Sequence, residues 1–329
     1  MGASFSSAIT QIFPPKPQFT EKNLPDLQGK VYLVTGSNTG VGKQLARLLY
    51  SKNAKVYIAA RSELKARQAI ADIQKAAPTS TGGLAFLHLD LGDLTTIKVS
   101  VERFLAAESK LHVLFNNAGV MRTEQEITRT AQGYESHIGI NNVGTFLFTK
   151  LLTPILVATA KSEAPNTVRV IWVSSSGTEF MAHKDVGVSL DNLDFHIEKA
   201  PIERYSISKA GNWCHGVEFA KRYQSEGVIS IPLNPGNLSS DLFRDQGALF
   251  KMFVKLVQYP PIDGAYTELF AGLSPKITLA LSGSWVIPFG RIYPIRKDLN
   301  AAMKTKAEGG TGGTHDFWEW SEEQVKPYL

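Results

Sequence analysis

A phenol and an amine stand four residues apart at Tyr205 and Lys209. Side chains at this spacing share one face of a helix. A tyrosine with its ordinary pKa of about 10 exchanges protons poorly at neutral pH, but a nearby ammonium favours the phenolate and lowers that pKa. The pair is therefore predicted to move a proton to or from a substrate as a general acid or base.

Three consecutive serines, at positions 174 to 176, end an apolar segment that is typical of a buried strand. Open α/β sheets bind their ligands at the carboxyl ends of the strands. A hydroxyl at this edge can hold a carbonyl oxygen, so Ser175 is a further candidate catalytic residue. The serine run does not by itself identify which of its three side chains points inward.

A glycine-rich turn connects the first strand-like segment to a helix-like segment that begins near Lys43. Glycine lets the chain turn tightly and lets backbone N–H groups approach a pyrophosphate, while the N-terminus of the helix attracts negative charge. The order strand, turn, helix makes a dinucleotide site the favoured interpretation, ahead of a simple turn. The glycines concerned are Gly36, Gly40 and Gly42.

The end of the second strand-like segment bears on the choice of dinucleotide. Folds that select NAD place an acidic residue here to bind the ribose 2′-hydroxyl. This chain has Arg61 instead, and a guanidinium suits the 2′-phosphate of NADP. The alternative interpretation of Arg61 is a solvated cation at the start of a helix. We expect NADPH to be preferred over NADH.

The elements that position these residues follow from the pattern of apolar segments. Short apolar or β-branched segments alternate with longer segments of helical period, as in βαβ units with a parallel sheet covered on both faces. The sequence predicts an α/β fold, a single doubly wound Rossmann-type domain with a seven-stranded, mostly parallel sheet and helices on both faces. The expected strands lie near residues 30–35, 55–61, 84–89, 113–116, 168–174, 228–233 and 284–288.

The Rossmann-type, NADP-binding catalytic domain is expected to span residues 29–300. Residues 1–28 are expected to form an N-terminal extension that packs on the domain through its apolar side chains, Ile9 and Phe13 among them. Residues 301–329 are expected to form a C-terminal tail that ends in a helix. The first residues also fit a myristoylation pattern at Gly2, for which an unmodified terminus is the favoured interpretation.

Composition excludes several classes of protein. Of the 329 residues 43% are hydrophobic and 20% charged, so the chain is not intrinsically disordered. The formal net charge of +5 is scattered, and no nucleic-acid partner is expected. The lone Cys214 excludes an internal disulfide and favours a reducing compartment. We expect a cytoplasmic protein with no transmembrane segment and no signal peptide.

Several ordered motifs are similar to those of the short-chain dehydrogenase/reductase family, which the chain resembles over about residues 29–282. The likeness is closest to the retinol-dehydrogenase and WW-domain-oxidoreductase-like branch, in particular to fungal members with a similar Trp-Glu-Trp tail. The motifs are Thr35-Gly36-x-x-x-Gly40-x-Gly42, Asp90-Leu91, Asn116-Asn117-Ala118-Gly119, Asn141-x-x-Gly144-x-Phe146, Ser175, Tyr205-x-x-x-Lys209 and Pro235-Gly236.

The resemblance implies a role for each catalytic residue. Tyr205 would donate the proton in carbonyl reduction, Ser175 would stabilise the substrate oxygen, and Asn141 would hold the water of a proton relay. Lys209 would modulate the pKa of Tyr205 and bind a ribose. The residues implied to contact the cofactor are Gly36, Ser37, Asn38, Gly40, Val41, Gly42, Arg61, Asp90, Leu91, Asn117, Ala118, Gly119, Tyr205, Lys209, Pro235, Gly236 and Ser240.

Two segments depart from the family pattern or extend it. Ser175 and Tyr205 are thirty positions apart, more than the family's usual separation, because residues 177–204 form an insertion. Its histidines and aspartates are expected to be surface groups, and no metal is expected. The aromatic-rich segment at about 240–262 is expected to be either a lid over an apolar substrate or a helix whose apolar stripe belongs to the core.

The resemblance implies reversible hydride transfer between NADP(H) and a hydrophobic ketone, aldehyde or secondary alcohol, with secondary metabolism as one setting. Reduction of a conjugated C=C bond on the same scaffold is an alternative. So is a protein that binds NADPH as a sensor or scaffold without turnover, because an α/β fold alone does not establish catalysis. The expected partner is a hydrophobic small molecule. A homo-oligomer through the helical segments 133–159 and 205–226 stays open, although the insertion could block that surface.

Overall fold

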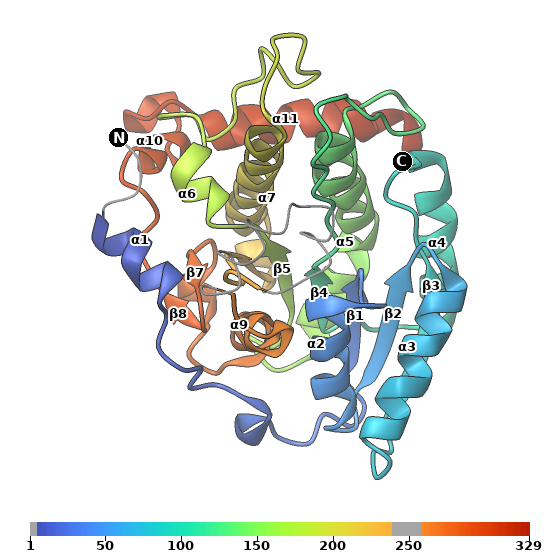
Figure 1. Ribbon diagram of the computed structural model, residues 1–329. Helices are drawn as coiled ribbons and strands as arrows, with labels where there is room; N and C mark the ends of the chain where they lie inside the picture. The colour runs from blue at the N-terminus through green and yellow to red at the C-terminus, as the bar shows by residue number, and fades with distance from the viewer. Residues whose placement is uncertain (1–4, 239–257) are drawn as a thin grey trace.

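The computed structural model describes residues 5–238 and 258–329. One sheet of eight strands, in the order β3-β2-β1-β4-β5-β6-β7-β8, runs through it (Figure 1). The strands are β1 Val31–Thr35, β2 Lys55–Ala60, β3 Gly83–His88, β4 Val113–Asn116, β5 Arg169–Val173, β6 Ile229–Leu233, β7 Val286–Ile287 and β8 Arg291–Ile292.

The α/β doubly wound fold is confirmed, and the number of strands is corrected from seven to eight. The first seven strands are parallel, and β8 pairs antiparallel with β7. The eighth strand has two residues and follows a turn at Gly290, whose φ is +83°. A strand this short contributes no alternating pattern, so the sequence does not reveal it.

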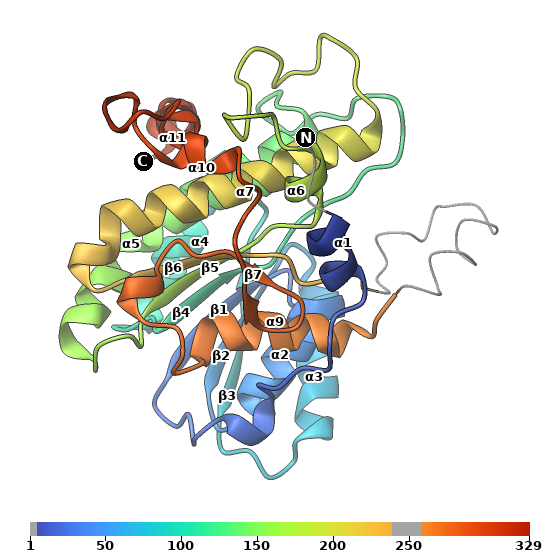
Figure 2. The same cartoon turned by 90° about the vertical axis from the view of Figure 1, so that its left-hand side faces the viewer.

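Helices cover both faces of the sheet, which makes three layers (Figure 2). One face carries α2 Gly40–Tyr50, α3 Glu63–Ala76 and α9 Pro261–Leu273. The other carries α4 Leu94–Ala107, α5 Thr145–Ser162 and α7 Pro201–Tyr223. Successive side chains of a strand point to opposite faces. Leu33 therefore packs in the core under α4, α5 and α7, and its neighbour Val34 packs under α2, α3 and α9.

The strand order places a ligand crevice in a definite position. Strand β1 pairs with β2 on one side and with β4 on the other. The connections that leave β1 and β4 therefore run in opposite directions across the sheet, and a crevice opens outside the carboxyl ends of these two strands. The glycine-rich turn follows β1 directly, so it lies at this crevice.

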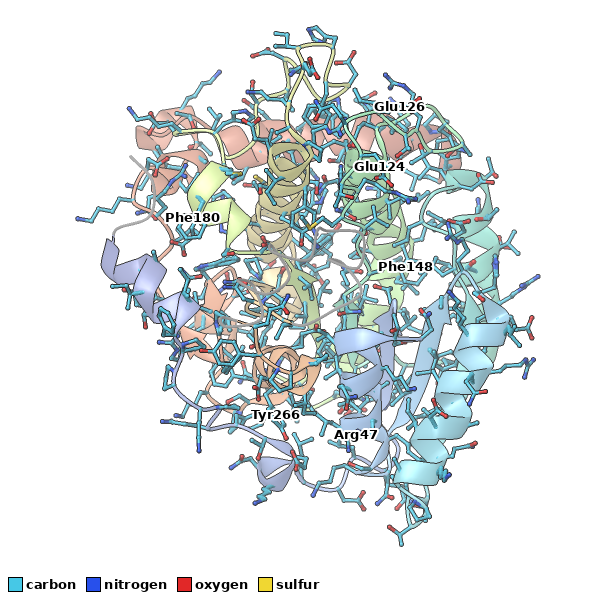
Figure 3. The ribbon with its side chains drawn as sticks, viewed as in Figure 1. Arg47, Glu124, Glu126, Phe148, Phe180 and Tyr266 are labelled. Atoms are coloured by element: carbon cyan, nitrogen blue, oxygen red, sulfur yellow. The ribbon has the colours of Figure 1, made fainter. Side chains whose placement is uncertain are left out.

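Helix α5 continues from a π-helical stretch, η2 Ile138–Gly144. Together they form the one helix of the described chain that is long and apolar enough to cross a membrane, Ile138–Ser162. Of its most apolar stretch of 18 residues, 67% is buried inside the protein. Phe148, labelled in Figure 3, is among its buried side chains. Its apolar character is therefore that of a core helix packed between the sheet and the tail.

The C-terminal tail forms two further helices, α10 Leu299–Met303 and α11 Gly313–Val325. Helix α11 lies across α7 and α5 on the outside of the layer that they form (Figures 1 and 2). Its aromatic side chains enter the core: the Phe317 ring stacks on His215 of α7 at 4.9 Å between centroids, and Trp318 meets Phe146 edge-on at 4.8 Å.

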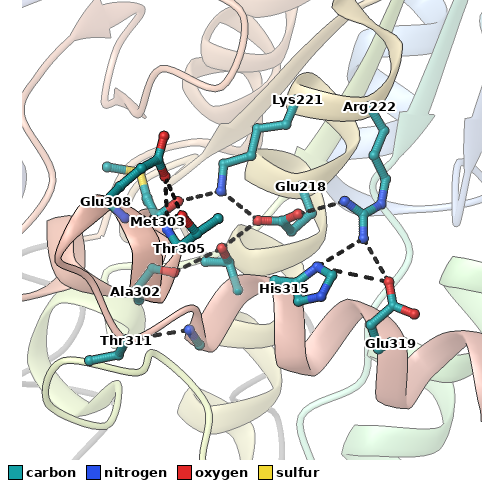
Figure 4. Close-up of polar contacts among 12 residues, drawn as sticks. Glu218, Lys221, Arg222, Ala302, Met303, Thr305, Glu308, Thr311, His315 and Glu319 are labelled. Carbon is teal, nitrogen blue, oxygen red and sulfur yellow. Dashed lines mark hydrogen bonds and ion pairs between the residues drawn. The ribbon is translucent and has the colours of Figure 1, made fainter.

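An ion-pair network fastens α11 to α7 (Figure 4). The buried Glu218 carboxylate accepts hydrogen bonds from Arg222 at 2.9 Å and from the Thr314 hydroxyl at 2.6 Å. Arg222 reaches on to Glu319 of α11 at 2.8 Å. The tail therefore covers much of the outer surface of α5 and α7. This is the surface through which a homo-oligomer was left open as a possibility by the sequence.

The N-terminal extension and the insertion complete the fold. Helix α1, Phe5–Ile12, lies against the short helix α6, Gly177–Met181, that opens the insertion. The rest of the insertion is irregular until α7 begins at Pro201. Phe180 of α6 is exposed at the surface (Figure 3). Ile9 and Phe13 are exposed as well, so the expected apolar packing of these two side chains is wrong.

Candidate active site

The glycine-rich turn has the geometry of a ligand cradle. Gly36 and Gly40 have φ values of +67° and +56°, which residues other than glycine rarely adopt. A Cβ on Gly42 would lie 2.5 Å from the Asn117 Nδ2 atom and 2.9 Å from the Ser37 Cα atom. The turn therefore presents backbone, not side chains, in front of the N-terminus of α2.

Residues after β4 fix this turn from the other side. The Asn117 amide donates to the Thr35 carbonyl at 2.7 Å, and the Ala118 N–H donates to the Thr35 hydroxyl at 2.9 Å. The next residue, Gly119, lies against the catalytic lysine, because a Cβ there would be 2.9 Å from Lys209 Nζ. The Asn117-Ala118-Gly119 segment therefore joins the cradle to the catalytic residues.

Arg61 lies beside the cradle. The Gly36 N–H donates to the Ala59 carbonyl at 2.8 Å, so the end of β2 is adjacent to the start of the turn. Arg61 follows two residues later and is exposed, and no carboxylate among residues 5–238 and 258–329 pairs with it. The Ser37 hydroxyl is buried and donates to the Val34 carbonyl at 2.7 Å, so it is not available to a ligand.

Asp90 and Leu91 follow β3 at the same edge. The Leu89 N–H donates to the Ala60 carbonyl at 3.1 Å, which places Asp90 close to the end of β2. The Asp90 carboxylate accepts the Gly92 N–H at 2.9 Å and is half-buried. Leu91 is buried. Both residues thus border the crevice on the side opposite to the catalytic helix.

Tyr205, in the second turn of α7, meets Ser175 at the end of β5. The nearby Ser175 hydroxyl lowers the pKa of Tyr205, but burial has the larger effect and raises that pKa to about 12. The lowering by Lys209 that the sequence suggested is not found. Tyr205 is therefore a neutral phenol at neutral pH, as a candidate proton donor must be.

The structure separates the three serines. Ser174 is buried, and its hydroxyl donates to the Lys209 carbonyl and pairs with Thr178, both at 2.7 Å. Ser175 is half-buried and faces Tyr205, while its Oγ atom accepts the Gly177 N–H at 3.2 Å. Ser174 therefore fixes α7 to the strand end, and Ser175 is the serine that joins Tyr205.

Lys209 lies one turn along α7 from Tyr205. Its Nζ atom donates to the Val173 carbonyl at 2.9 Å and lies 5.8 Å from the centre of the Tyr205 ring. Burial lowers the pKa of Lys209 to about 8, and the charge of Glu268 opposes this shift. The ammonium is therefore largely retained at neutral pH, beside the phenol and below the Gly119 backbone.

Asn141 lies in the π-helical stretch η2. Its amide donates to the Val120 carbonyl at 3.0 Å and to the Ser208 hydroxyl at 2.9 Å, and its carbonyl accepts the Val120 N–H at 2.8 Å. Single π-helical turns inside a helix recur at functional sites. Here the turn directs Asn141 between the segment after β4 and α7.

Pro235 and Gly236 form a turn after β6, and Gly236 has a φ of +108°. The turn therefore needs glycine at its second position. Ser240 and most of the expected lid fall outside the described residues. Of the lid segment, residues 258–262 are described, and α9 begins within them at Pro261.

Known fungal proteins are similar to this chain over almost its whole length. The chain is 54% identical to a short-chain dehydrogenase/reductase of Neocamarosporium betae, over 98% of this chain and 94% of that one. It is 51% identical to a short-chain dehydrogenase/reductase of Phomopsis amygdali, over 99% and 98% of the two chains. A family model described as short chain dehydrogenase matches residues 30–185. The chain is a short-chain dehydrogenase/reductase of the fungal type.

Solved structures show the same fold. A protein from Mycobacterium paratuberculosis has a TM-score of 0.65 and 27% identity, over 94% of this chain and 97% of that one. The 3-ketoacyl-(acyl-carrier-protein) reductase of Brucella melitensis, complexed with NADH, has a TM-score of 0.60 and 21% identity, over 80% and 98% of the chains. The dehydrogenase/reductase is thus an oxidoreductase of a family with nicotinamide-bound structural neighbours.

A buried histidine beside Tyr205 was not found from the sequence. The His137 ring meets the Tyr205 ring edge-on at 6.1 Å. His137 Nδ1 bonds to Glu135 at 2.7 Å, and Nε2 accepts the Arg122 N–H at 2.8 Å. In this dehydrogenase/reductase these bonds hold the segment after β4 against α7, the helix that carries Tyr205 and Lys209. Neither residue belongs to a spacing pattern that would have marked it.

A buried acid of the dehydrogenase/reductase, Glu268 on α9, was also missed. It is fully buried, and neither carboxylate oxygen has a hydrogen-bond partner among the described residues. Burial raises the pKa of Glu268 to about 8, although the charge of Lys209 lowers it. Glu268 is thus a largely protonated acid that shares the interior with the catalytic lysine. Its place in an apolar helix, Thr267-Glu268-Leu269, is the signal that could have found it.

This burial predicts a pH-dependent stability difference for Glu268→Gln. The carboxyl loses its proton near pH 4.5 in the unfolded chain and near pH 8 in the folded one. As the pH rises between these values, the unfolded state is favoured, so the wild type loses stability that the variant keeps. Between pH 6 and pH 8 the free energy of unfolding of the wild type should fall by roughly 1–3 kcal/mol relative to that of the variant. Urea unfolding of both proteins at each pH measures it, and a constant gap would contradict the assignment.

The insertion contributes no metal site to the dehydrogenase/reductase as far as it is described. Asp194 and His196 pair with each other at 2.6 Å on the surface. His183 accepts the Ser189 N–H at 2.9 Å. Across residues 5–238 and 258–329, no three His, Cys, Asp or Glu side chains gather in a way that could hold a metal. The insertion residues therefore stabilise their own loop.

Proposed function

We propose that this protein is an NADPH-dependent oxidoreductase that interconverts a hydrophobic ketone or aldehyde and the corresponding alcohol. The observation that carries the proposal is the meeting of Tyr205, Ser175 and Lys209 at the carboxyl edge of the sheet, beside the glycine cradle. A cytoplasmic location and a small apolar substrate as the partner are part of the proposal. The lone, buried Cys214 supports the location.

The residues present fit a dinucleotide. No heavy atom lies within 4 Å of a Cβ built on Gly40, so the backbone at the start of α2 is open to a ligand, while Gly42 and Gly119 let Asn117 and Lys209 pack closely beside it. The Gly36 to Gly42 turn would hold the pyrophosphate at the N-terminus of α2. Lys209 would bind the ribose of the nicotinamide half, and the turn at Pro235 and Gly236 would hold the nicotinamide itself. When bound, the cofactor supplies or accepts the hydride.

The side chains account for the proton and for the charge on the substrate oxygen. The Ser175 hydroxyl hydrogen-bonds to the carbonyl oxygen and orients it toward the phenol. The Tyr205 hydroxyl gives its proton to that oxygen as negative charge develops there, and the Ser175 hydroxyl stabilises the phenolate that is left. Asn141 would hold the water of a relay through which a proton returns to Tyr205.

The proposed preference for NADPH predicts that Arg61→Ala weakens NADPH but barely affects NADH. The 2′-phosphate would lose a charge-assisted hydrogen bond, which is worth roughly 1.5–3 kcal/mol, and the lower end is expected because Lys65 lies nearby. Isothermal titration of both cofactors measures the change. Arg67→Ala, on the exposed face of α3 and paired with Glu63, is the matched control. An equal loss for the two cofactors would contradict the role of Arg61.

A panel of hydrophobic ketones, aldehydes and enones, with NADPH oxidation followed by absorbance and products identified, tests the reaction. Alcohol products from ketones or aldehydes support the proposal. Saturated carbonyl products from the enones alone would favour C=C reduction. NADPH binding without turnover of any compound in the panel would favour a sensor or scaffold.

A further inference from the structure

Helix α1 docks on the protein through its polar side. Ser7 and Gln11 are 5% and 3% exposed, whereas Ile9 and Phe13 are 44% and 61% exposed. If the hydrophobic effect alone held this helix, its apolar side chains would be buried and its polar side chains exposed. Buried polar side chains are kept only where they are hydrogen-bonded, so the partners of Ser7 and Gln11 define what this helix does.

One set of partners is the buried carboxylate of Glu179 on α6. Glu179 accepts from the Ser7 hydroxyl at 3.0 Å, from the Gln11 amide at 2.9 Å and from the Trp285 indole at 2.8 Å. These donors come from two separate segments of the chain, α1 and the residue before β7. The Glu179 carboxylate therefore fixes the Gln11 amide nitrogen on its own side, which leaves the Gln11 carbonyl oxygen to face the other way.

The Gln11 carbonyl faces the end of β6. The buried Asn234 amide donates to Gln11 Oε1 at 2.9 Å, and the Asn234 Oδ1 atom accepts the Gly236 N–H at 3.0 Å. The two ends of an amide group are nearly alike in shape, and the contact with Gln11 selects the orientation in which the oxygen faces Gly236. Glu179, Gln11 and Asn234 thus form a relay that ends on the turn after β6.

We propose that Gln11 is a positioning residue that holds the Pro235–Gly236 turn, through Asn234, in the conformation that receives the nicotinamide end of the cofactor. The inference rests on the proposed function, because that function assigns the nicotinamide to this turn. It extends the cofactor site to a residue of the N-terminal extension. Two contacts of the neighbouring Thr10 hold this end of α1 in place: the Arg291 guanidinium donates to the Thr10 hydroxyl at 2.7 Å and to the Thr10 carbonyl at 2.6 Å.

The test compares two ligands. NADPH carries the nicotinamide, and adenosine 2′,5′-bisphosphate carries only the adenosine end. Gln11→Met keeps the length of the side chain but removes its polar contacts with Ser7, Glu179 and Asn234. Loss of one neutral hydrogen bond corresponds to a roughly 2- to 12-fold change in an equilibrium constant. The Kd of NADPH should rise by that factor, the Kd of adenosine 2′,5′-bisphosphate should not change, and KM for NADPH should rise more than kcat falls.

Two further variants distinguish positioning from simple support of the fold. Ser7→Ala removes the contacts of this hydroxyl with Glu179 and with the Gln11 amide. It leaves the bonds from Gln11 to Glu179 and from Asn234 to Gln11, so the Kd of NADPH should stay at its wild-type value. In an Asn234→Ala background, Gln11→Met should add no further loss of NADPH affinity. Thermal unfolding of each variant identifies any that fail to fold.

The outcomes are separable. Equal losses for the two ligands, equal effects of Gln11→Met and Ser7→Ala, or additive losses in the Asn234→Ala background would overturn the positioning role. A wild-type protein that binds adenosine 2′,5′-bisphosphate and NADPH with the same affinity would show that the nicotinamide end makes no favourable contact, and would also overturn it. A wild-type protein that binds neither ligand would overturn the proposed function itself.

Discussion

Tyr205→Phe is expected to lower kcat by roughly 10²- to 10⁴-fold, which is the contribution of a positioned general acid or base. The change removes one oxygen and keeps the ring, its edge contact with His137 and the helix around it. Because the phenol is the proton donor and not a main cofactor contact, the Kd of NADPH should stay close to the wild-type value. Steady-state kinetics on a reducible carbonyl, with titration of NADPH, measures both quantities.

Tyr223→Phe is the matched control for this experiment. Tyr223 ends the same helix, and its ring packs on Phe219 at 4.4 Å, far from the strand ends. Its kcat should equal that of the wild type. If Tyr205→Phe retained wild-type kcat, Tyr205 would not be the proton donor, and the mechanism would be wrong.

Lys209→Ala is expected to weaken both cofactor binding and turnover. The lysine is assigned the ribose of the cofactor, so the Kd of NADPH should rise by roughly 10- to 150-fold, the equivalent of a hydrogen bond to a charged group. The loss in kcat should be at least as large. The fold should tolerate the change, because Asn212 also donates to the Val173 carbonyl, at 3.0 Å.

Lys161→Ala, at an exposed ion pair near the end of α5, controls for loss of a positive charge. It should alter neither Kd nor kcat. Unchanged NADPH affinity in Lys209→Ala would contradict the assignment of this lysine to the ribose. Unchanged kcat would show that turnover does not depend on Lys209.

The sequence predicted the fold well because the parallel strands are continuous apolar segments that helices separate. Val31 to Val34 are buried on both faces of the sheet, and such a segment is recognisable without its neighbours. The eighth strand could not be predicted, because β8 consists of two residues held by their pairing with Val286 and Ile287. Helix α1 was expected, but not its orientation, since burial of Ser7 and Gln11 depends on Glu179, far away in the sequence.

The candidate site, too, could be predicted from the sequence only in part. The residues expected from the motifs lie at one edge of the sheet, because parallel strands end there whatever their separation in the sequence. Electrostatic properties were less predictable. The spacing of Tyr205 and Lys209 suggested a lowered tyrosine pKa, whereas burial raises it. Glu268 sits on a helix from the other face of the sheet, so neither spacing nor composition indicated that it would share the interior with Lys209.

The tail helix α11 has a consequence for the order of folding. Its Phe317 and Trp318 rings complete the core over His215 and Phe146, which lie far earlier in the sequence. Until α11 docks, the outer side of α5 and α7 is uncovered and exposes aromatic surface. In a partly folded chain this surface can meet either its own tail helix or another chain.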